Sequence, residues 1–553
     1  MIDIIEKIAG AMQAIGTELR QKGVLDEPLQ VKTSDFLIPQ DRRNGEISTP
    51  ILMKVSSRLD RQELLRTFCE QLAGRDIPYL KEVVPAPPGY LNFHLKPEAL
   101  TDHLRQLVQR PAPPVENIGR GRKVLVEFVS ANPTGPLTIA HGRQAAFGEA
   151  LARILSECGY AVTREYYLND EGRQIDLLGE SLKARCDRLA GTETPIPEGG
   201  YQGDYLVPMA EKLVAEFGPA LREKDNRFFV EKAVTEILAV IKQDLQSFGI
   251  KFDSYQSQAE LTRQGLIAET IARLEEKGVT YRSEDALFLR TTDFKDDKDR
   301  VLKKSDGSYT YLAPDLAYHR LKFQKGCDLL INLWGPDHHG YINRLKGGLQ
   351  ALGFDPDKIR IIILQLTTIY RGKEKIRMST RFGEFLPLSL VTEELSPDVA
   401  RFFFLSRKAS SHLDFDLELA KKETAENPIF YLQYATARIA SLFRYRNEQQ
   451  PGPDSAPEDA DPNLLREPEE KEIMLLLSRF GPTVVSAAES FEPQVLLTYL
   501  LSLVKVFHRY YQRCQIVGPD SKLTASRLML ISGLEKTLKQ GFLLLNVYAP
   551  DQM

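Results

Sequence analysis

Cysteine is scarce, tryptophan occurs once, and the 553-residue chain has no long hydrophobic run. The five cysteines are scattered, odd in number and free of the paired spacing of zinc sites, so the sequence predicts a reducing compartment and no metal site. Residues 1–19 mix Asp3, Glu6 and Lys7 with apolar residues, which is typical of an amphipathic helix and not of a signal peptide. No segment is long and apolar enough to cross a bilayer. We therefore expect a cytoplasmic protein that does not enter a membrane.

A strong charge of one sign is also lacking. The formal net charge is −4, from 72 basic and 76 acidic residues. This balance excludes a generally basic nucleic-acid-binding surface, so any contact with RNA must use local basic patches. Hydrophobic residues make up 42% of the chain, as in globular proteins, and the length suggests about three or four domains.

Residues 1–112 have the pattern of a small α+β domain. Helical stretches alternate with short strands, which we expect at residues 51–55 and 90–94. A cluster of prolines at 111–114 then indicates a linker.

Residues 118–390 alternate strands with helices, which favours an α/β domain with a doubly wound parallel sheet. The pattern predicts a strand at 329–333, a helix at 341–352 and a strand at 359–365. A charged helical insertion at about 177–261 is expected to decorate the sheet without joining it.

Strand signals vanish after residue 391, so residues 391–553 are expected to form a helical bundle. Leu496, Leu500, Leu503 and Phe507 recur at the spacing of one helix face. Residues 449–470 are dense in proline, aspartate and glutamate and have little to bury, which predicts a surface loop.

The most informative stretch is residues 130–143, because it connects a predicted strand to a predicted helix. The strand, residues 123–129, is nearly continuous in apolar residues, as in a parallel strand covered on both faces. After His141, apolar residues recur at helical spacing up to Gly159, and a second strand is expected at 162–168. The start of a helix after such a turn presents unpaired N–H groups and partial positive charge. The stretch therefore indicates a nucleotide-binding turn.

This turn resembles the first signature of class I aminoacyl-tRNA synthetases, and its flanks resemble the arginyl enzymes. In the signature this chain has Thr138, Ile139, Ala140 and His141. Further matches follow in family order, at residues 169–172, 309–318, 334–341, 377–381 and 427–435. The resemblance spans nearly the whole chain, and so many matches in order are hard to obtain by chance. It implies a Rossmann-like catalytic domain, a tRNA-contacting N-terminal domain and an anticodon-binding helical bundle.

The resemblance implies that arginine is joined to tRNA(Arg) through an arginyl-adenylate, with ATP as substrate, Mg²⁺ and no covalent enzyme nucleophile. The protein would act as a monomer, and arginine activation would need bound tRNA. Catalysis would rest on positioning and charge stabilisation. The residues that would carry it are Thr138, His141 and the second-signature residues Arg377, Met378, Ser379, Thr380 and Arg381. The nucleotide would contact Pro133, Thr134, Gly135, Ala140 and Gly142.

Recognition of arginine needs acceptors, because a guanidinium has five donors and no acceptor. The resemblance places Asp315 at the guanidinium with Tyr311 alongside, one helical turn away. The other expected arginine contacts are Ser130, Ala131, Asn132, His141, His338 and Gln258. The family usually has a second acidic residue where this chain has Gln258, and either Gln258 itself or Glu260 could replace it.

For tRNA, the expected contacts are Tyr431, Tyr434, Arg438 and the C-terminal Met553. Unstacked bases can stack on tyrosines while arginines meet phosphates. Two alternatives stay open. The changes at Thr138, Ala140, Gln258, Arg377 and Thr380 would suit a synthetase-like tRNA-binding protein with impaired catalysis, and the first signature alone would suit a small-molecule nucleotidylyltransferase.

Overall fold

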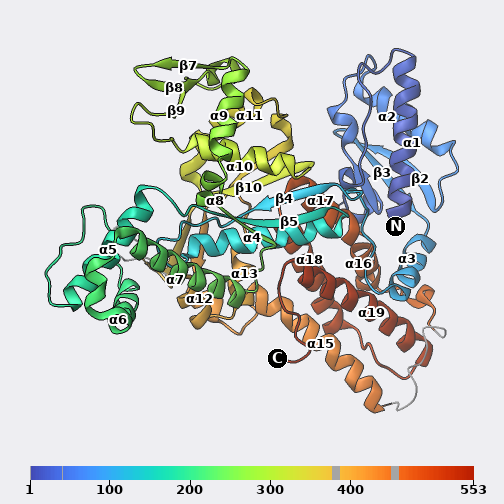
Figure 1. Ribbon diagram of the computed structural model, residues 1–553. Helices are drawn as coiled ribbons and strands as arrows, with labels where there is room; N and C mark the ends of the chain where they lie inside the picture. The colour runs from blue at the N-terminus through green and yellow to red at the C-terminus, as the bar shows by residue number, and fades with distance from the viewer. Residues whose placement is uncertain (1, 40, 377–386, 450–459) are drawn as a thin grey trace. The chain divides into compact units, whose positions relative to one another are not determined.

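The computed structural model describes residues 2–39, 41–376, 387–449 and 460–553. The chain forms two compact units (Figure 1). One is Gly119–Lys422, and the other combines Met1–Ile118 with Glu423–Met553. The N-terminal and C-terminal segments, which we expected to be separate domains, therefore share one unit. The predicted domain boundaries stay predictions.

Unit Gly119–Lys422 is built on a parallel five-stranded sheet with the order β11-β10-β4-β5-β6. The first strand in the chain is central, the next two lie on one side of it and the last two on the other, so the sheet is doubly wound as predicted. The order in which the strands are added to the sheet reverses between β4 and β10. The strands are β4 (Lys123–Glu127), β5 (Ala161–Leu168), β6 (Ser254–Ser257), β10 (Leu329–Trp334) and β11 (Ile359–Ile363).

Helix α4 (Ile139–Glu157) follows β4 and packs against the sheet and against α13 (Pro397–Leu405). Its predicted apolar face is buried, and Gly159, at φ +84°, ends the turn that leads into β5. Gly148 lies where α4 passes over Phe128, and a methyl group there would overlap the phenyl ring. The absence of a side chain at Gly148 thus lets the helix lie close to the central strand.

Two insertions interrupt the sheet. The first, between β5 and β6, is helical, and the second, between β6 and β10, carries a small antiparallel sheet in the order β7-β8-β9. The first contains α5 (Arg173–Leu189), α6 (Leu206–Phe217) and α7 (Asn226–Ser247). The second contains α8 (Gln258–Arg263), α9 (Leu266–Glu276), β7 (Thr280–Ser283), β8 (Ala286–Leu289), β9 (Arg300–Lys303) and α10 (Leu312–Gln324).

One expectation about the first insertion is wrong. Strand β6 lies inside the range 177–261, yet it is the edge strand of the main sheet. The strand has no apolar run. Backbone pairing with β5 and the stacking of Tyr255 on Tyr166 hold it in place. A polar edge strand carries no periodic signal that sequence reasoning could detect.

The end of the same unit contains α11 (Ile342–Ala351), α12 (Leu388–Glu394), α13 and α14 (Leu417–Lys421), together with a small sheet in the order β13-β12-β14. Its strands are β12 (Thr367–Arg371), β13 (Glu374–Lys375) and β14 (Leu413–Asp416). The expectation of no strand after residue 391 is therefore wrong. In β14 the buried Leu413 and Phe415 alternate with an exposed aspartate, a pattern too short to stand out among the helices.

In the other unit, an antiparallel sheet in the order β1-β3-β2 packs with α1 (Ile2–Gln21) and α2 (Arg61–Ala73). Its strands are β1 (Ile47–Thr49), β2 (Leu80–Ala86) and β3 (Tyr90–Leu95). The strand predicted at 90–94 is confirmed, whereas residues 51–55 are not a strand. Pro50 ends β1 and precedes a 3₁₀ helix, Ile51–Lys54, because proline supplies no N–H for a strand ladder.

The C-terminal helices of this unit are α15 (Pro428–Gln449), α16 (Pro468–Leu477), α17 (Phe480–Ser490), α18 (Gln494–Arg513) and α19 (Ser521–Leu544). The predicted apolar face of α18 is buried. The loop expected at 449–470 ends earlier than predicted, because Glu469 and Glu470 are buried in α16. Arg513 donates to Glu469, and Arg527 and Tyr510 donate to Glu470, at 2.6–2.9 Å.

Helix α3 (Glu98–Gln109) packs against α16 and α19 and so joins the two ends of the chain within this unit. Lys536 donates to the carbonyl oxygens of Val108 and Arg110 at 2.6 Å, and Arg479 donates to that of Phe36. In the described ranges, none of the helices is long and apolar enough to span a membrane.

Replacing Gly148 by alanine is expected to destabilise unit Gly119–Lys422 by about 1–3 kcal/mol, because the added methyl group must displace the Phe128 ring. Gly347→Ala is the matched control, since a methyl group there meets Phe294 at an ordinary 3.4 Å in helix α11. Chemical denaturation measures both variants. Equal stability of the two would contradict the close packing of α4 on β4.

Candidate active site at the strand switch point

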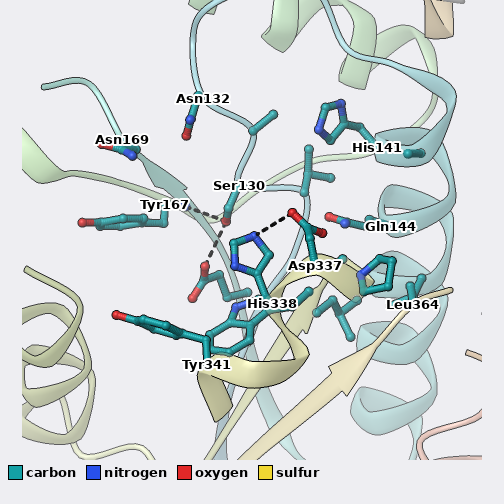
Figure 2. Close-up of a pocket in the computed structure, with 18 of the residues that line it drawn as sticks. Ser130, Asn132, His141, Gln144, Tyr167, Asn169, Asp337, His338, Tyr341 and Leu364 are labelled. Carbon is teal, nitrogen blue, oxygen red and sulfur yellow. Dashed lines mark hydrogen bonds and ion pairs between the residues drawn. The ribbon is translucent and has the colours of Figure 1, made fainter. Parts of the chain in front are cut away.

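A pocket of about 730 Å³ opens where the carboxyl ends of β4, β5, β10 and β11 meet (Figure 2). This is the place at which the sheet order reverses, and ligands bind there in open α/β sheets. Eight of the predicted site residues line it: Ser130, Ala131, Asn132, Ala140, His141, Tyr311, Asp315 and His338. Residues far apart in the sequence thus converge as predicted on one cavity.

The turn after β4 is held in an unusual backbone conformation. Val129 and Ser130 have φ of +67° and +39°, which is strained for residues with a side chain. The Ser130 hydroxyl donates to Glu127 at 3.1 Å and accepts the backbone N–H of Tyr167 at 3.1 Å. Tyr166 donates to the Ala131 carbonyl oxygen at 2.8 Å. Strand β5 therefore fixes the turn that borders the pocket.

Asn132 extends from this turn toward helix α5. Its amide nitrogen donates to Gln174 at 2.8 Å, which leaves the amide oxygen to accept from a ligand. An ammonium group is a suitable donor for that oxygen.

His141 lies at the first turn of α4, where its ring is coupled to Thr138. The Thr138 backbone N–H donates to His141 Nδ1 at 3.0 Å, and the threonine hydroxyl lies 3.1 Å from the same atom. Burial lowers the pKa of His141 to about 4, so the ring is neutral near pH 7. Because Nδ1 accepts, the proton resides on Nε2, which can donate to an anionic oxygen. Thr138 therefore orients the histidine.

The remaining predicted nucleotide contacts do not line the pocket. The Thr134 carbonyl oxygen accepts from Tyr205 at the start of α6, and that ring lies beside Gly135. Gly142 is buried, and a methyl group there would meet Leu388 of α12. The first insertion thus supports the turn from outside.

Asp315 lies in the first turn of α10 and lines the pocket beside Tyr341, which Figure 2 shows at the end away from His141. Burial raises the pKa of Asp315 to about 7. The nearby Glu127 adds to this rise, and the Tyr341 hydroxyl and Lys322 oppose it. In the ligand-free protein this carboxyl is therefore about half protonated near pH 7. A cation placed beside it would restore its charge.

A buried network lies beneath Asp315 and links α10 to β4 and β10. Lys322, fully buried, pairs with Glu127 and donates to the Asn332 oxygen at 3.3 Å. The Asn332 amide donates to His319 Nε2 at 2.7 Å, and His319 Nδ1 donates to the Asp315 carbonyl oxygen at 2.8 Å. Burial lowers the pKa of His319 well below its usual value, which agrees with a neutral ring in this role. The network fixes the helix that carries Asp315.

Gln258 does not line the pocket but contacts a residue that does. It is buried at the start of α8 and accepts the Tyr167 hydroxyl at 2.9 Å. Glu260, the other candidate for the second acidic contact, pairs with Arg263 and does not line the pocket.

The two ends of the pocket differ in character (Figure 2). His141, Gln144 and Leu364 lie at one end, and Tyr167, Tyr341 and Asn169 at the other. His338 and Asp337 lie between them, with Asp337 3.6 Å from the imidazole. Leu364 and the exposed Leu366 supply an apolar surface beside α4. The pocket can thus hold a flat apolar group at one end and a cation at the other.

Several lining residues did not emerge as site candidates from the sequence: Glu127, Gln144, Tyr167, Asn169, Gln174, Asp337 and Tyr341. Glu127 could have been identified as a site residue from the sequence, because it is a charged residue at the end of an apolar strand. Tyr167 lies near the end of β5 and Asn169 directly follows it. Because the carboxyl ends of parallel strands meet at one edge of the sheet, both residues could have been expected at the site.

The second-signature residues Arg377, Met378, Ser379, Thr380 and Arg381 lie outside the described residues. The chain leads to them through β12 and β13. The described chain resumes at Pro387, and the N–H of the next residue, Leu388, donates to the Leu137 carbonyl oxygen at 2.8 Å. Arg143 of α4, fully buried, donates to the carbonyl oxygens of Gln365, Lys408 and Ser411 at 2.7–3.0 Å. Leu388 is therefore tied to the turn before α4, and Arg143 holds the backbone of Gln365, which lines the pocket.

The predicted tRNA contacts lie in the other unit, on α15 and at the C-terminus. The Arg438 guanidinium lies between the rings of Tyr434 and Tyr511, 4.3 and 4.7 Å from their centres. Tyr434 is exposed, whereas Tyr431 packs on His508. Met553 is 56% exposed. Tyr434 and Arg438 thus form a stacked aromatic and basic surface.

In the part of the chain that the structure describes, no cluster of histidine, cysteine, aspartate or glutamate could hold a metal ion by itself. Mg²⁺ needs few protein ligands when phosphates supply the others.

Three segments of the chain match known families. Residues 3–95 match the arginyl tRNA synthetase N terminal domain, residues 106–402 the catalytic domain of class I tRNA synthetases (R), and residues 432–553 the DALR anticodon binding domain. These matches extend from near the first residue to the last.

Relatives match over the full length. An arginine–tRNA ligase of Desulfosudis oleivorans is 40% identical over 99% of this chain and 100% of its own length. One of Halorhodospira halophila is 38% identical over 97% of each chain. The structure of the Thermus thermophilus arginyl-tRNA synthetase has the same fold, with a TM-score of 0.78 at 23% identity over 99% of this chain and 100% of that one.

Replacing Asp315 by asparagine is expected to stabilise the ligand-free protein, and the gain should grow from about pH 4 to about pH 7. The folded carboxyl has a pKa of about 7 against 3.8 for an ordinary aspartate, so the folded form binds the proton more tightly. That stabilisation is lost as the pH rises through this window, and asparagine has none to lose. Thermal unfolding across the pH range measures it; a gain independent of pH would contradict the assignment.

Proposed function

The chain belongs to the arginyl-tRNA synthetase family, and from this premise we propose how its pocket joins L-arginine to tRNA(Arg). The arginine carboxylate attacks the α-phosphate of ATP, pyrophosphate leaves, and the arginyl-adenylate passes its acyl group to the terminal ribose of the tRNA, releasing AMP. The observation that carries this assignment is the Asp315 carboxyl close to the Tyr341 and Tyr167 side chains, in a pocket at the strand switch point.

Arginine occupies the Asp315 end. The guanidinium lies against the Asp315 carboxylate, which its positive charge keeps ionised. Tyr311, although 68% exposed, is the N-cap residue of the same helix and lines the same pocket. The ammonium group meets the Asn132 amide oxygen, and His338 borders the carbon chain. The arginine carboxylate then points toward the His141 end.

ATP occupies the His141 end. The neutral His141 donates its Nε2 proton to an oxygen of the α-phosphate and stabilises the charge that develops as the carboxylate attacks. The start of α4 adds its partial positive charge. Thr138 keeps the imidazole in the donating tautomer, and the apolar surface of Leu364 and Leu366 suits the adenine ring. Ala140 borders the same space.

The leaving pyrophosphate is balanced by the basic second-signature segment. We assign this to Arg377 and Arg381, with Met378, Ser379 and Thr380 shaping the segment and Lys373 and Lys375 before it adding charge. Mg²⁺ bound with ATP would supply further positive charge to the triphosphate, and the phosphates would be its main ligands.

We also propose which residues contact the tRNA. Tyr434 and Arg438 offer stacking and charge to unstacked anticodon bases, and Tyr431 and Met553 border that surface. We also propose a monomer with three functional parts, 1–112, 118–390 and 391–553. Five free cysteines support a reducing compartment such as the cytoplasm.

The alternative of a catalytically impaired tRNA-binding protein has no observation in its favour. The altered first signature still orients a neutral histidine toward the pocket, because threonine bonds to its Nδ1. A small-molecule nucleotidylyltransferase would have no use for the anticodon binding domain at residues 432–553.

Charging of unfractionated tRNA with each of the twenty amino acids is expected to give a signal for arginine alone. Asp315→Ala should reduce arginine charging by a factor of at least about 10² while the protein stays folded, because the guanidinium loses its charged partner. Asp306→Ala removes an exposed carboxylate of the same unit and should charge tRNA normally. Normal charging by Asp315→Ala would overturn the assignment.

A further inference from the structure

Two buried tyrosine hydroxyls flank the end of the pocket that holds Asp315. The Tyr167 and Tyr341 side chains project toward the same end in Figure 2. The Tyr341 hydroxyl faces the Asp315 carboxyl, and this contact lowers the pKa of the carboxyl. A hydroxyl whose proton is turned to an ionised carboxylate keeps its oxygen lone pairs for the donors of a ligand.

The Tyr167 hydroxyl is the first member of a chain of hydrogen bonds that leads out of the pocket. It donates to the Gln258 amide oxygen at 2.9 Å. The Gln258 amide nitrogen donates to Glu171 at 3.0 Å. Thr262 of the same helix also donates to Glu171. Glu171 itself lies in the loop after β5 and does not line the pocket.

The chemistry of these groups sets the direction of every bond in the chain. A carboxylate only accepts, so Gln258 must turn its amide nitrogen to Glu171 and its oxygen to Tyr167. That oxygen in turn accepts the Tyr167 proton. The Tyr167 oxygen is then left with its lone pairs for the pocket. Burial and the neighbouring Asp315 raise the pKa of Tyr167 well above its usual value, so the hydroxyl keeps the proton that this scheme requires.

Resting on the function proposed above, we propose that Glu171 is a positioning residue for arginine specificity: acting through Gln258, it makes Tyr167 a hydrogen-bond acceptor toward the guanidinium. Asp315 and Tyr341 complete a set of acceptors around a ligand group that has only donors. A neutral urea group of the same shape, as in citrulline, brings a carbonyl oxygen that would face acceptors only.

Other carboxylates near this end are engaged elsewhere. Glu127 is paired with Lys322, and Glu260 with Arg263. Asp170 accepts from the Ser257 hydroxyl at 2.6 Å and from the Ala259 N–H at 2.9 Å, which holds the start of α8. Glu171 is the carboxylate that bonds to Gln258, the position at which the family resemblance leads us to expect an acidic residue. The negative charge thus lies one hydrogen bond farther from the pocket than an acidic residue at position 258 would place it.

The test compares Glu171→Gln with Glu260→Gln in steady-state charging of tRNA(Arg). Glutamine at 171 can either accept from Gln258 or donate to it, so the direction of the chain is no longer fixed and the Tyr167 proton turns into the pocket in part of the molecules. We expect the KM for arginine to rise about tenfold with kcat within about twofold, and competition by citrulline to strengthen. Glu260→Gln removes the same charge from the neighbouring helix and should change neither.

The double variant Glu171→Gln/Gln258→Glu is expected to restore the KM for arginine. Its carboxylate accepts the Tyr167 proton directly, so the KM for arginine should return to within about threefold of the unchanged chain. A KM for Glu171→Gln equal to that of Glu260→Gln, or a double variant no better than Glu171→Gln, would overturn the role of Glu171. Failure of the unchanged chain to charge tRNA with arginine would instead refute the proposed function.

Discussion

The ion pair between Lys322 and Glu127 is the interaction on which the site depends. Both side chains are buried, and breaking such a pair would leave an uncompensated charge inside the protein at a cost of about 3–5 kcal/mol. Glu127 ends the central strand and receives the Ser130 hydroxyl, while Lys322 lies on the helix that begins near Asp315. One pair of charges therefore joins the strained turn after β4 to the helix that carries the proposed guanidinium ligand.

Burial sets the protonation of the groups at this end of the pocket. It raises the pKa of Asp315, Tyr167 and Tyr341 above their usual values. In the ligand-free protein the ionised Asp315 carboxylate is destabilised by burial, and a guanidinium bound beside it would stabilise that charge. In the proposed function, recognition of the guanidinium thus relies on a carboxyl whose ionised form the empty pocket disfavours, which exchanges stability for function.

The sequence predicted the doubly wound sheet, because apolar strands and amphipathic helices alternate with clear periods, and it brought Asn132, His141 and Asp315 to one cavity. It missed elements held by single contacts, such as β6, and the buried carboxylates of α16, whose arginine partners lie far away in the chain. The roles of Tyr167 and Glu171 depend on the directions of hydrogen bonds, which only coordinates reveal. Local patterns indicate which elements form, whereas long-range partners decide which polar groups are available to a ligand.

The most direct test of the central claim is the number of protons released when arginine binds, obtained by calorimetry in buffers of different ionisation enthalpy. If the Asp315 carboxyl titrates near pH 7 when empty and is held ionised by the guanidinium, about half a proton should leave at pH 7, approaching one in more acidic solution and none in more basic solution. Arginine binding without proton release at every pH would contradict the account.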